Sequence, residues 1–336
     1  MAYQIKISGT DVVFSAEKGE RLLDAAARAG LNFPHACRCG FCGMCAATVV
    51  SGDFIAYAPG SAEGRPSKGP RILTCSTEAA SDAEISIQFT RLSPNVRMRV
   101  ASMERLAPDV IRLVLQPVSG EPFSYLPGQF VDFILEGGER RSYSIAAAHA
   151  KAGLELHIRH VPGGLFTDRL FGVKGDPVAK GTEFEVAAPS GEFRIDRESG
   201  HDIVFLMTGT GFAPAKAMIE SLISRPLEGK AVYLYWGGRH RADLYMDELC
   251  RSWDAKYEWF HYCPVLSRAT PEEAWDGRTG HVQNAFVADH PDASGFDAYI
   301  CGSMRLVEDS VRALKAAGMK EENIRSDAFT SKAGLN

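Results

Sequence analysis

The sequence lacks the features of a membrane, exported or nucleic-acid-binding protein. No apolar run reaches the roughly 18 residues of a membrane-spanning helix. The opening MAYQIKISGT has neither the basic start nor the apolar centre of a signal peptide. The formal net charge is −5, without a basic stripe that could neutralise a phosphate backbone. These absences predict a cytoplasmic protein that has neither a membrane nor a nucleic acid as a partner.

The composition is that of an ordinary globular protein with more than one domain. Apolar residues make up 45% of the 336 positions and charged residues 24%. A domain typically contains about 100–200 residues, so two or three domains are expected. Changes in pattern place three predicted domains at residues 1–92, 93–199 and 200–336. The eight cysteines indicate metal binding or catalysis rather than disulfides, because the compartment is predicted to be reducing.

Four cysteines of the first domain have the spacing of a plant-type 2Fe-2S site. Cys37, Cys42 and Cys45 follow the pattern C-x4-C-x2-C in a loop, and Cys75 comes much later. Two tetrahedral irons joined by two sulfides need two thiolates each, so a tight loop must curl around the cluster while one ligand arrives from elsewhere. A zinc site or unligated cysteines are the alternatives, although zinc sites usually contain paired C-x2-C units. Cys39 is predicted not to be a ligand, because including it would break the spacing.

Nearly all of residues 1–92 resemble a plant-type ferredoxin. The resemblance lies in the string Cys37-Arg38-x-Gly40-x-Cys42-Gly43-x-Cys45. It implies a β-grasp-like fold in which the four spaced cysteines hold the cluster. Cys39 departs from the family, which more often has Glu or Ser at that position. Phe41 and Met44, beside the cluster loop, are a candidate docking patch for another protein, or apolar residues without a role.

The second domain contains short alternating strands, separated by about 8–12 residues, which is typical of an antiparallel β-barrel or sandwich. Within it, the string Arg141-Ser142-Tyr143-Ser144 combines a guanidinium, an aromatic ring and a hydroxyl. Tyr143 can stack on a flat ring, Ser144 can hydrogen-bond a ring nitrogen, and Arg141 can bind a pyrophosphate. The alternative is a surface strand with alternating polar groups.

The order of four short motifs in this domain resembles the FAD-binding barrel of the ferredoxin–NADP reductase superfamily. The motifs are PGQF, RSYS, PGGLFT and AAPSGEF. The resemblance implies an FAD bound by Arg141, Tyr143, Ser144, Gly164 and Thr167. The strand that contains His157 ends near the Gly163-Gly164 turn, whose free N–H groups suit a phosphate. His157 and Gly163 are therefore also predicted to contact the cofactor.

Strands and helices alternate in the third domain, which predicts a doubly wound parallel sheet. An apolar strand over 202–207 is followed by Gly209-Thr210-Gly211, and Pro214 fits the first turn of the next helix. Later strands end at Gly237, Arg239, Cys301 and Gly302. The carboxyl ends of parallel strands share one edge, so these residues are expected to line one crevice. The alternative for GTG is a tight strand-to-helix turn without a ligand.

This third domain resembles the pyridine-nucleotide domain of the same superfamily, through its GTG-x-AP and CG-x-x-M strings. The resemblance implies that Gly209, Thr210 and Gly211 contact the nucleotide and that Cys301 lies beside the nicotinamide. Tyr143, Ser144 and Cys301 are accordingly the predicted catalytic contacts. The string YWGGRHRADLY looks like the NADH-using members, although its arginines would suit NADPH. Phe329 resembles the late aromatic residue that covers the flavin, or is simply a packed side chain.

The order of the three domains implies electron transfer from NADH to FAD to the 2Fe-2S cluster and on to a partner. The whole chain resembles the reductase components of multicomponent bacterial aromatic-ring oxygenases, so the predicted partner is a terminal oxygenase. It also resembles NADH-dependent reductases that serve deoxysugar dehydratases, and a general ferric or flavin reductase is a further alternative. An alternative of another class is a non-catalytic adaptor with a structural zinc ion.

Overall fold

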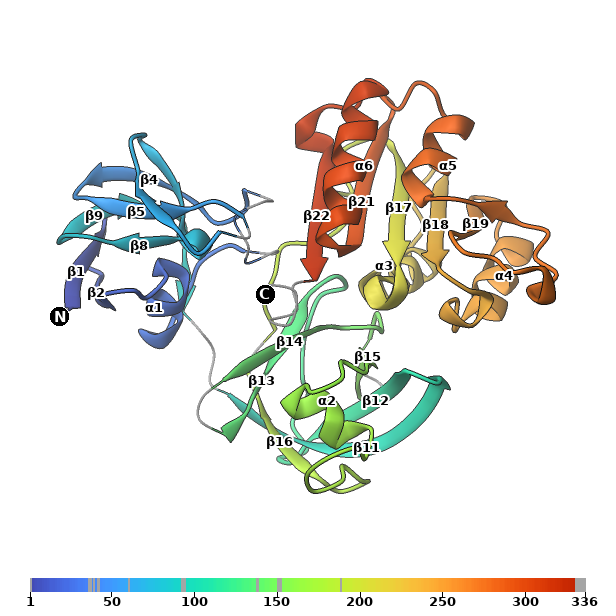
Figure 1. The fold of residues 1–336 in the computed structure, drawn as a ribbon, viewed down its shortest axis with the longest axis horizontal. Coiled ribbons are helices and arrows are strands. Elements are labelled where there is room, and N and C mark those ends of the chain that lie inside the picture. The colour runs from blue at the N-terminus through green and yellow to red at the C-terminus, as the bar shows by residue number, and fades with distance from the viewer. Residues whose placement is uncertain are drawn as a thin grey trace. The chain divides into compact units, whose positions relative to one another are not determined.

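A computed structural model of the chain describes residues 2–35, 38, 40, 43–59, 61–91, 95–136, 139–149, 153–187 and 189–329 (Figure 1). The chain forms two compact units. The first comprises residues 1–94, 190–192 and 330–336, and the second comprises residues 95–189 and 193–329. Among the described residues, no helix is both long and apolar enough to cross a membrane.

The first unit is built on a mixed five-stranded sheet packed against one helix. The sheet order is β2-β1-β9-β4-β7, in which β1 pairs antiparallel with β2 and parallel with β9. Alternation buries Ile5 and Ile7 of β1, and the apolar face of α1 adds Leu22 and Ala26 to the same core. These observations confirm the predicted β-grasp-like fold. The elements of this unit are β1 (Ala2–Ile7), β2 (Val13–Glu17), α1 (Leu22–Arg28), β3 (Leu31–Asn32), β4 (Ala46–Ser51), β5 (Phe54–Tyr57), β6 (Gly64–Pro66), β7 (Arg71–Leu73), η1 (Thr74–Ser76), β8 (Thr77–Ala79), β9 (Ala83–Ser86) and β10 (Thr90–Arg91).

The second unit begins with a curled antiparallel sheet of order β14-β13-β16-β11-β12-β15. Beyond the end of β14, Ile145 forms an antiparallel bridge with Leu156 of β15, which joins the two edges of the sheet. Phe133 in the centre contacts Phe166 of the short helix α2, with ring centroids 4.7 Å apart. The predicted antiparallel barrel is therefore confirmed. Its elements are β11 (Val96–Ala107), β12 (Val110–Pro117), β13 (Phe130–Ile134), β14 (Arg140–Ser144), β15 (Leu154–Arg159), α2 (Leu165–Leu170) and β16 (Glu183–Val186).

The remainder of the second unit is a six-stranded parallel sheet of order β20-β19-β18-β17-β21-β22. Its elements are β17 (Asp202–Thr208), η4 (Gly209–Gly211), α3 (Phe212–Ser224), β18 (Val232–Gly238), η5 (Arg241–Asp243), α4 (Asp247–Lys256), β19 (Phe260–Leu266), η6 (Pro271–Glu273), β20 (Arg278–Thr279), α5 (Val282–Asp289), β21 (Phe296–Ser303), α6 (Met304–Ala316), η7 (Glu321–Asn323) and β22 (Ile324–Phe329). The strand order reverses beside β17, and a ligand of such a sheet binds at the carboxyl ends there. The doubly wound prediction is confirmed.

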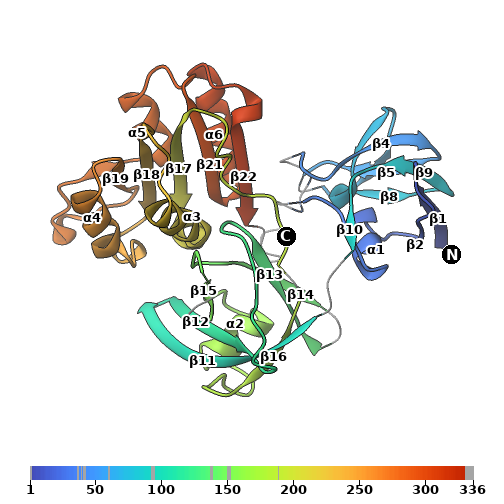
Figure 2. The ribbon, with the colours of Figure 1, turned by 180° about the vertical axis from the view of Figure 1, so that it is seen from behind.

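Helices cover both faces of the parallel sheet. The ribbon shows helices on either side of this sheet (Figures 1 and 2). Side chains of α3 and α4 share one core with Phe205 and Trp236, while α5 contacts α6. The segment that leads from the barrel into β17 belongs to the same core, because Phe193 is buried in it and Ile195 packs against it. An added Cβ at Gly128 in the barrel would overlap with the carbonyl oxygen of Phe193. The connecting segment is thus tightly packed on both sides.

Candidate cofactor and electron-transfer sites

Two of the four predicted iron ligands meet in the first unit. Cys45 directly precedes β4 and Cys75 lies in η1 directly after β7, and pairing of β4 with β7 brings them together. Their Sγ atoms are 3.2 Å apart, both residues are buried, and neither forms a disulfide. The backbone N–H of Gly40 donates to the Cys75 Sγ at 3.2 Å. Converging buried thiols with an N–H donor fit a metal–thiolate cluster. Cys37 and Cys42, with Cys39 and Phe41, lie outside the described residues.

The loop between these ligands is fixed to helix α1. Arg38 has a left-handed backbone conformation, with φ of 54°, and its guanidinium forms a 2.6 Å ion pair with Asp24 of α1. Further along the loop, Met44 is 38% exposed. Of the two residues of the predicted docking patch, Phe41 and Met44, only Met44 is among the described residues, and it is exposed.

The predicted flavin residues of β14 point to two faces of the barrel sheet. Arg141 and Tyr143 share one face, because side chains alternate along a strand, and Ser144 lies on the other, where it is buried. The Tyr143 ring packs edge-on against Phe133 at 5.5 Å. Burial raises the pKa of the Tyr143 phenol, so the hydroxyl stays neutral at physiological pH. The Arg141 guanidinium forms a 2.6 Å ion pair with Glu139.

The predicted phosphate loop has a tight, internally bonded shape. The Thr167 hydroxyl donates to the carbonyl oxygen of Val161 at 2.9 Å and accepts the Val161 N–H at 3.2 Å. An added Cβ at Gly164 would lie 2.6 Å from the Thr167 hydroxyl oxygen, and Gly163 has φ of 78°. Both glycines are therefore needed for this loop to reach the start of α2.

Glycines bring the carboxyl ends of three parallel strands together at the predicted nucleotide edge. An added Cβ at Gly211 would overlap with the carbonyl oxygen of Cys301, and one at Gly302 would overlap with the hydroxyl of Thr208. Gly237 of β18 lies against the same threonine. The three glycines therefore allow close packing of the strand ends at this edge. Thr210 is half-buried in η4, and Pro214 is buried in the first turn of α3.

Cys301 and Phe329 end neighbouring strands at this edge. Cys301 is fully buried, and burial, with the Asp327 carboxylate second, raises the pKa of its thiol well above the ordinary value. A neutral buried thiol is a poor nucleophile, in keeping with a predicted role beside the nicotinamide rather than in covalent catalysis. Phe329 pairs with Ser303 across β21 and β22 and is 38% exposed. Its predicted contact with the flavin stays a prediction.

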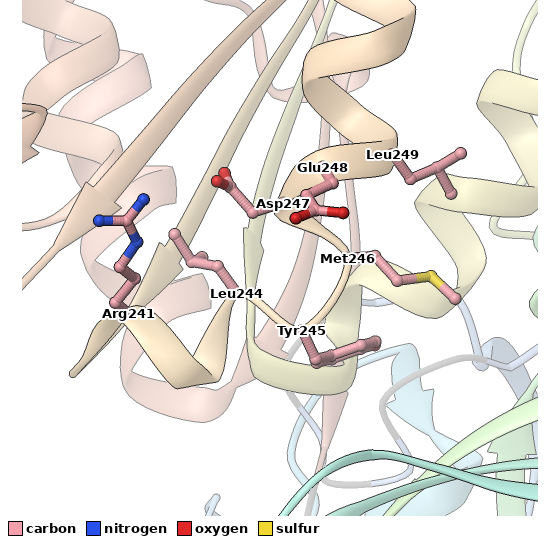
Figure 3. Close-up of a pocket in the computed structure, with 7 residues that line it drawn as sticks. All are labelled: Arg241, Leu244, Tyr245, Met246, Asp247, Glu248 and Leu249. Atoms are coloured by element: carbon pink, nitrogen blue, oxygen red, sulfur yellow. The ribbon is translucent and has the colours of Figure 1, made fainter.

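The loop after β18 is held by carboxylates. Asp243 accepts the backbone N–H groups of Arg239 at 2.7 Å and His240 at 3.1 Å, and Glu273 accepts that of Arg241 at 2.7 Å. The Arg239 side chain is exposed. A cavity of about 430 Å³ follows, and all its lining residues come from η5, the turn after it and the first turn of α4 (Figure 3). The lining residues are Arg241, Leu244, Tyr245, Met246, Asp247, Glu248 and Leu249.

His157, which is predicted to contact a cofactor, has protein partners on both ring nitrogens. Its Nε2 lies 3.0 Å from Glu155 Oε1, and its Nδ1 lies 3.0 Å from the Tyr245 hydroxyl. Burial lowers the pKa of His157 and raises that of Tyr245 well above its usual value, so the imidazole is neutral and the phenol protonated. Tyr245 therefore donates to Nδ1, and Nε2–H donates to Glu155. The predicted contact between His157 and a cofactor stays a prediction.

Sequence reasoning missed the residues that join the barrel to the parallel sheet. Arg159 of β15 forms ion pairs with Asp109 at 3.1 Å and with Asp243 at 3.2 Å. Lys216 of α3 forms an ion pair with Glu155 of β15 at 3.1 Å. A signal was present for Lys216 alone, because a lysine interrupts an otherwise apolar helical face.

Comparisons with known proteins assign each part of the chain. Residues 5–80 match the 2Fe-2S iron-sulfur cluster binding domain, residues 97–195 the oxidoreductase FAD-binding domain, and residues 205–312 the oxidoreductase NAD-binding domain. The chain therefore has domains for a 2Fe-2S cluster, FAD and NAD. The described cysteine pair, the β14 residues and the glycine-lined edge fall within these three matches respectively.

Whole-length relatives have the same organisation. The chain is 33% identical over 336 residues to the CDP-6-deoxy-L-threo-D-glycero-4-hexulose-3-dehydrase reductase of Yersinia pestis, covering 98% of this chain and 99% of that one. It is 31% identical to reductase component 1 of the terephthalate 1,2-dioxygenase of a Comamonas species, covering 98% of both. The crystal structure of an Amycolatopsis cytochrome P450 reductase matches with a TM-score of 0.76 and 30% identity, over 98% of this chain and 99% of that one. The chain belongs to the family of oxidoreductases that join a 2Fe-2S domain to FAD- and NAD-binding domains and that includes these reductase components.

Proposed function

We propose that the protein carries electrons from NADH through FAD and the 2Fe-2S cluster to a separate acceptor protein. A flavin can link NADH to the 2Fe-2S cluster, because it accepts a hydride and releases electrons singly. The observation that carries the proposal is the pair of buried thiols, Cys45 and Cys75, in one chain with the flavin and nucleotide domains. A cytoplasmic location is part of the proposal, since cysteines that serve as metal ligands are typical of a reducing compartment.

We infer NADH rather than NADPH as the electron donor. The support is the loop after β18, where the carboxylates of Asp243 and Glu273 are held by backbone N–H groups. A 2′-phosphate entering this loop would meet both negative charges. The comparison of kcat/KM for the two nucleotides, with ferricyanide as acceptor, tests this inference. A preference for NADPH would refute it.

We infer that the acceptor is a terminal oxygenase. The support is the number of oxygenase reductases among the relatives, including the phenol hydroxylase P5 protein of Acinetobacter pittii and the xylene/toluene monooxygenase electron transfer component of Pseudomonas putida. A second candidate is a deoxysugar dehydrase, favoured by 33% identity to the Yersinia dehydrase reductase. NADH-dependent turnover reconstituted with each purified acceptor class separates the two candidates.

Anaerobic addition of NADH to the purified protein tests the electron route itself. We expect bleaching of the flavin absorbance together with the electron paramagnetic resonance signal of a reduced 2Fe-2S cluster. A colourless protein that contains zinc would support the adaptor alternative instead. A flavin that is reduced while the cluster stays oxidised would break the proposed order.

A further inference from the structure

Helix α3 carries two charged residues, Lys216 and Glu220, in a segment that is otherwise apolar or neutral. The helix begins directly after Gly209–Gly211, the turn predicted to contact the nucleotide. Lys216 is only 5% exposed. A buried ammonium group is unfavourable unless every donor is paired, so the partners of this lysine are informative.

Three oxygen atoms surround the Lys216 ammonium group, and two of them belong to carboxylates. Its Nζ atom lies 2.7 Å from Glu220 Oε1 and 3.1 Å from Glu155 Oε1. It also donates to the carbonyl oxygen of Ala146 at 2.9 Å. Glu220 belongs to the same helix, whereas Glu155 and Ala146 belong to the barrel. Two carboxylates therefore compensate the charge of the lysine, and two of its three contacts cross to the flavin domain.

Glu220 adds a second bond across the same boundary. Its other carboxylate oxygen, Oε2, accepts the backbone N–H of Ala148 at 3.1 Å. One turn of α3 thus holds the barrel backbone at two positions, the carbonyl of Ala146 and the N–H of Ala148. Ala146 is two residues beyond Ser144, the predicted contact of the flavin ring. Lys216 and Glu220 therefore contact the segment that directly follows the predicted flavin residues.

A chain of contacts returns from Glu155 to the start of the same helix. Glu155 accepts from His157, which accepts from Tyr245. The Tyr245 ring meets Trp236 edge-on at 5.0 Å, and Trp236 stacks on Phe212, the first residue of α3, at 4.1 Å and 15°. The contacts form a closed ring through the barrel, the loop after β18 and α3. Such a closed ring resists changes in the angle between the two domains.

We propose that Lys216 and Glu220 are positioning residues for hydride transfer. Resting on the proposed function, the inference is that they fix the spacing between the segment of Tyr143 and Ser144 and the turn at Gly209–Gly211. A transfer of this kind needs reacting atoms about 3–3.5 Å apart, and a displacement of 1 Å can lower the rate roughly a hundredfold. Their side chains contact the backbone of Ala146 and Ala148 and the carboxylate of Glu155.

A purely structural role is a poor alternative for these residues. Replacing a whole buried ion pair by apolar side chains of similar volume is often neutral for stability, whereas removing one partner alone is strongly destabilising, so a loss of stability cannot identify the role. Two of the three contacts with the barrel end on backbone atoms at defined positions, and the third is the ion pair with Glu155. The distinguishing readout is therefore the rate of the chemical step and not the melting temperature.

The test uses the full-length holoprotein and anaerobic stopped-flow reduction of its flavin by NADH and by NADH deuterated at the transferred position. For Lys216→Met we expect the limiting rate to fall by about tenfold or more, with a larger isotope effect. The dissociation constant for NADH and the FAD content should stay near those of the wild type. Lys216→Arg, which keeps a cationic donor, should recover part of the rate.

The matched control is Lys315→Met, which removes an exposed lysine from α6 in the same domain. It should leave the rate and the isotope effect unchanged. An unchanged limiting rate and isotope effect in Lys216→Met would overturn the inference, as would an equal fall in the control. If Lys216→Met does not fold, Glu220→Ala, which removes the bond to Ala148, decides the matter by the same readout. Failure of NADH to reduce the wild-type flavin would refute the proposed function, which is a separate result.

Discussion

The Sγ atoms of Cys45 and Cys75 lie 3.2 Å apart, although the residues are thirty positions apart in the chain. The closeness follows from backbone pairing, since Ala46 and Leu73 are partners in β4 and β7. The Thr74 N–H also donates to the carbonyl oxygen of Cys45 at 3.0 Å. The pairing of β4 with β7 therefore positions the two cysteines that are distant in sequence.

Replacement of Cys75 should separate two activities. In Cys75→Ser, reduction of cytochrome c should fall by at least about tenfold, because a cluster ligand is lost. Reduction of ferricyanide by NADH should persist, since a flavin alone can perform it. Cys263→Ser, at a half-buried thiol in the parallel sheet, is the control and should keep both activities. Equal loss of both activities with flavin still bound would contradict the relay order.

Removal of the Tyr143 ring should weaken flavin binding. In Tyr143→Ala we expect FAD affinity to fall by about tenfold or more, because a large packed aromatic surface is lost. Tyr143→Phe should retain FAD, since it keeps the ring and its contact with Phe133. FAD content after gel filtration measures both. A full complement of FAD in Tyr143→Ala would contradict a role for Tyr143 in flavin binding.

A methyl group at Gly211 should disturb the nucleotide edge. An alanine Cβ there would overlap with the carbonyl oxygen of Cys301, so β17 and β21 must separate locally. We expect the free energy of unfolding to fall by about 1–3 kcal/mol and NADH binding to weaken. Gly295→Ala is the control, because nothing lies within 4 Å of an added Cβ there. Calorimetry and NADH titration should therefore distinguish the two variants.

Acid should weaken the contact between barrel and parallel sheet through His157. Burial lowers the pKa of His157 below its ordinary value of 6.5 in the folded protein. Below that pH the unfolded chain binds more protons than the folded one, so the contribution of the neutral imidazole is lost as the pH falls. Burial raises the pKa of Glu155, but the hydrogen bond from His157 and the charge of Lys216 lower it further, to about 2. The contribution of this carboxylate is therefore lost only between its ordinary value of 4.5 and about 2.

Denaturant unfolding between about pH 8 and 5 measures the effect of His157. His157→Gln should give a flatter dependence of the unfolding free energy on pH than the wild type, because no imidazole has to charge. His149→Gln removes an exposed histidine of the same unit and should leave the slope unchanged. Parallel slopes for all three proteins would contradict the buried, neutral state of His157.

The sequence predicted the features that depend on local pattern. The apolar strand predicted over 202–207 appears as β17, and the short alternating strands predicted for the second domain appear as its antiparallel sheet. The convergence of Gly209 and Cys301 at one edge was also predictable, because parallel strands of a doubly wound sheet end on the same side. These properties are set by short stretches of chain and by topology.

Contacts between domains were beyond the reach of sequence reasoning. The hydrogen bond between His157 and Tyr245 joins residues that are 88 positions apart. The bond from Lys216 to the carbonyl oxygen of Ala146 spans 70 positions. Such bonds depend on the angle at which two domains pack, and no local pattern encodes that angle. The side-chain partners of charged residues in a boundary therefore need the folded structure.

The burial of Phe193 in the core beside β17 has a practical consequence for dissecting the protein. A recombinant fragment cut at residue 200 would lose this ring and the neighbouring Ile195, leaving an apolar hole against Phe205 and Tyr299. A fragment for spectroscopy of nucleotide binding should therefore begin before Phe193. Such a cut removes from the barrel the backbone segment that packs against Gly128. Neither the barrel nor the parallel-sheet domain can be isolated without loss of packing, because the segment around Phe193 contacts both.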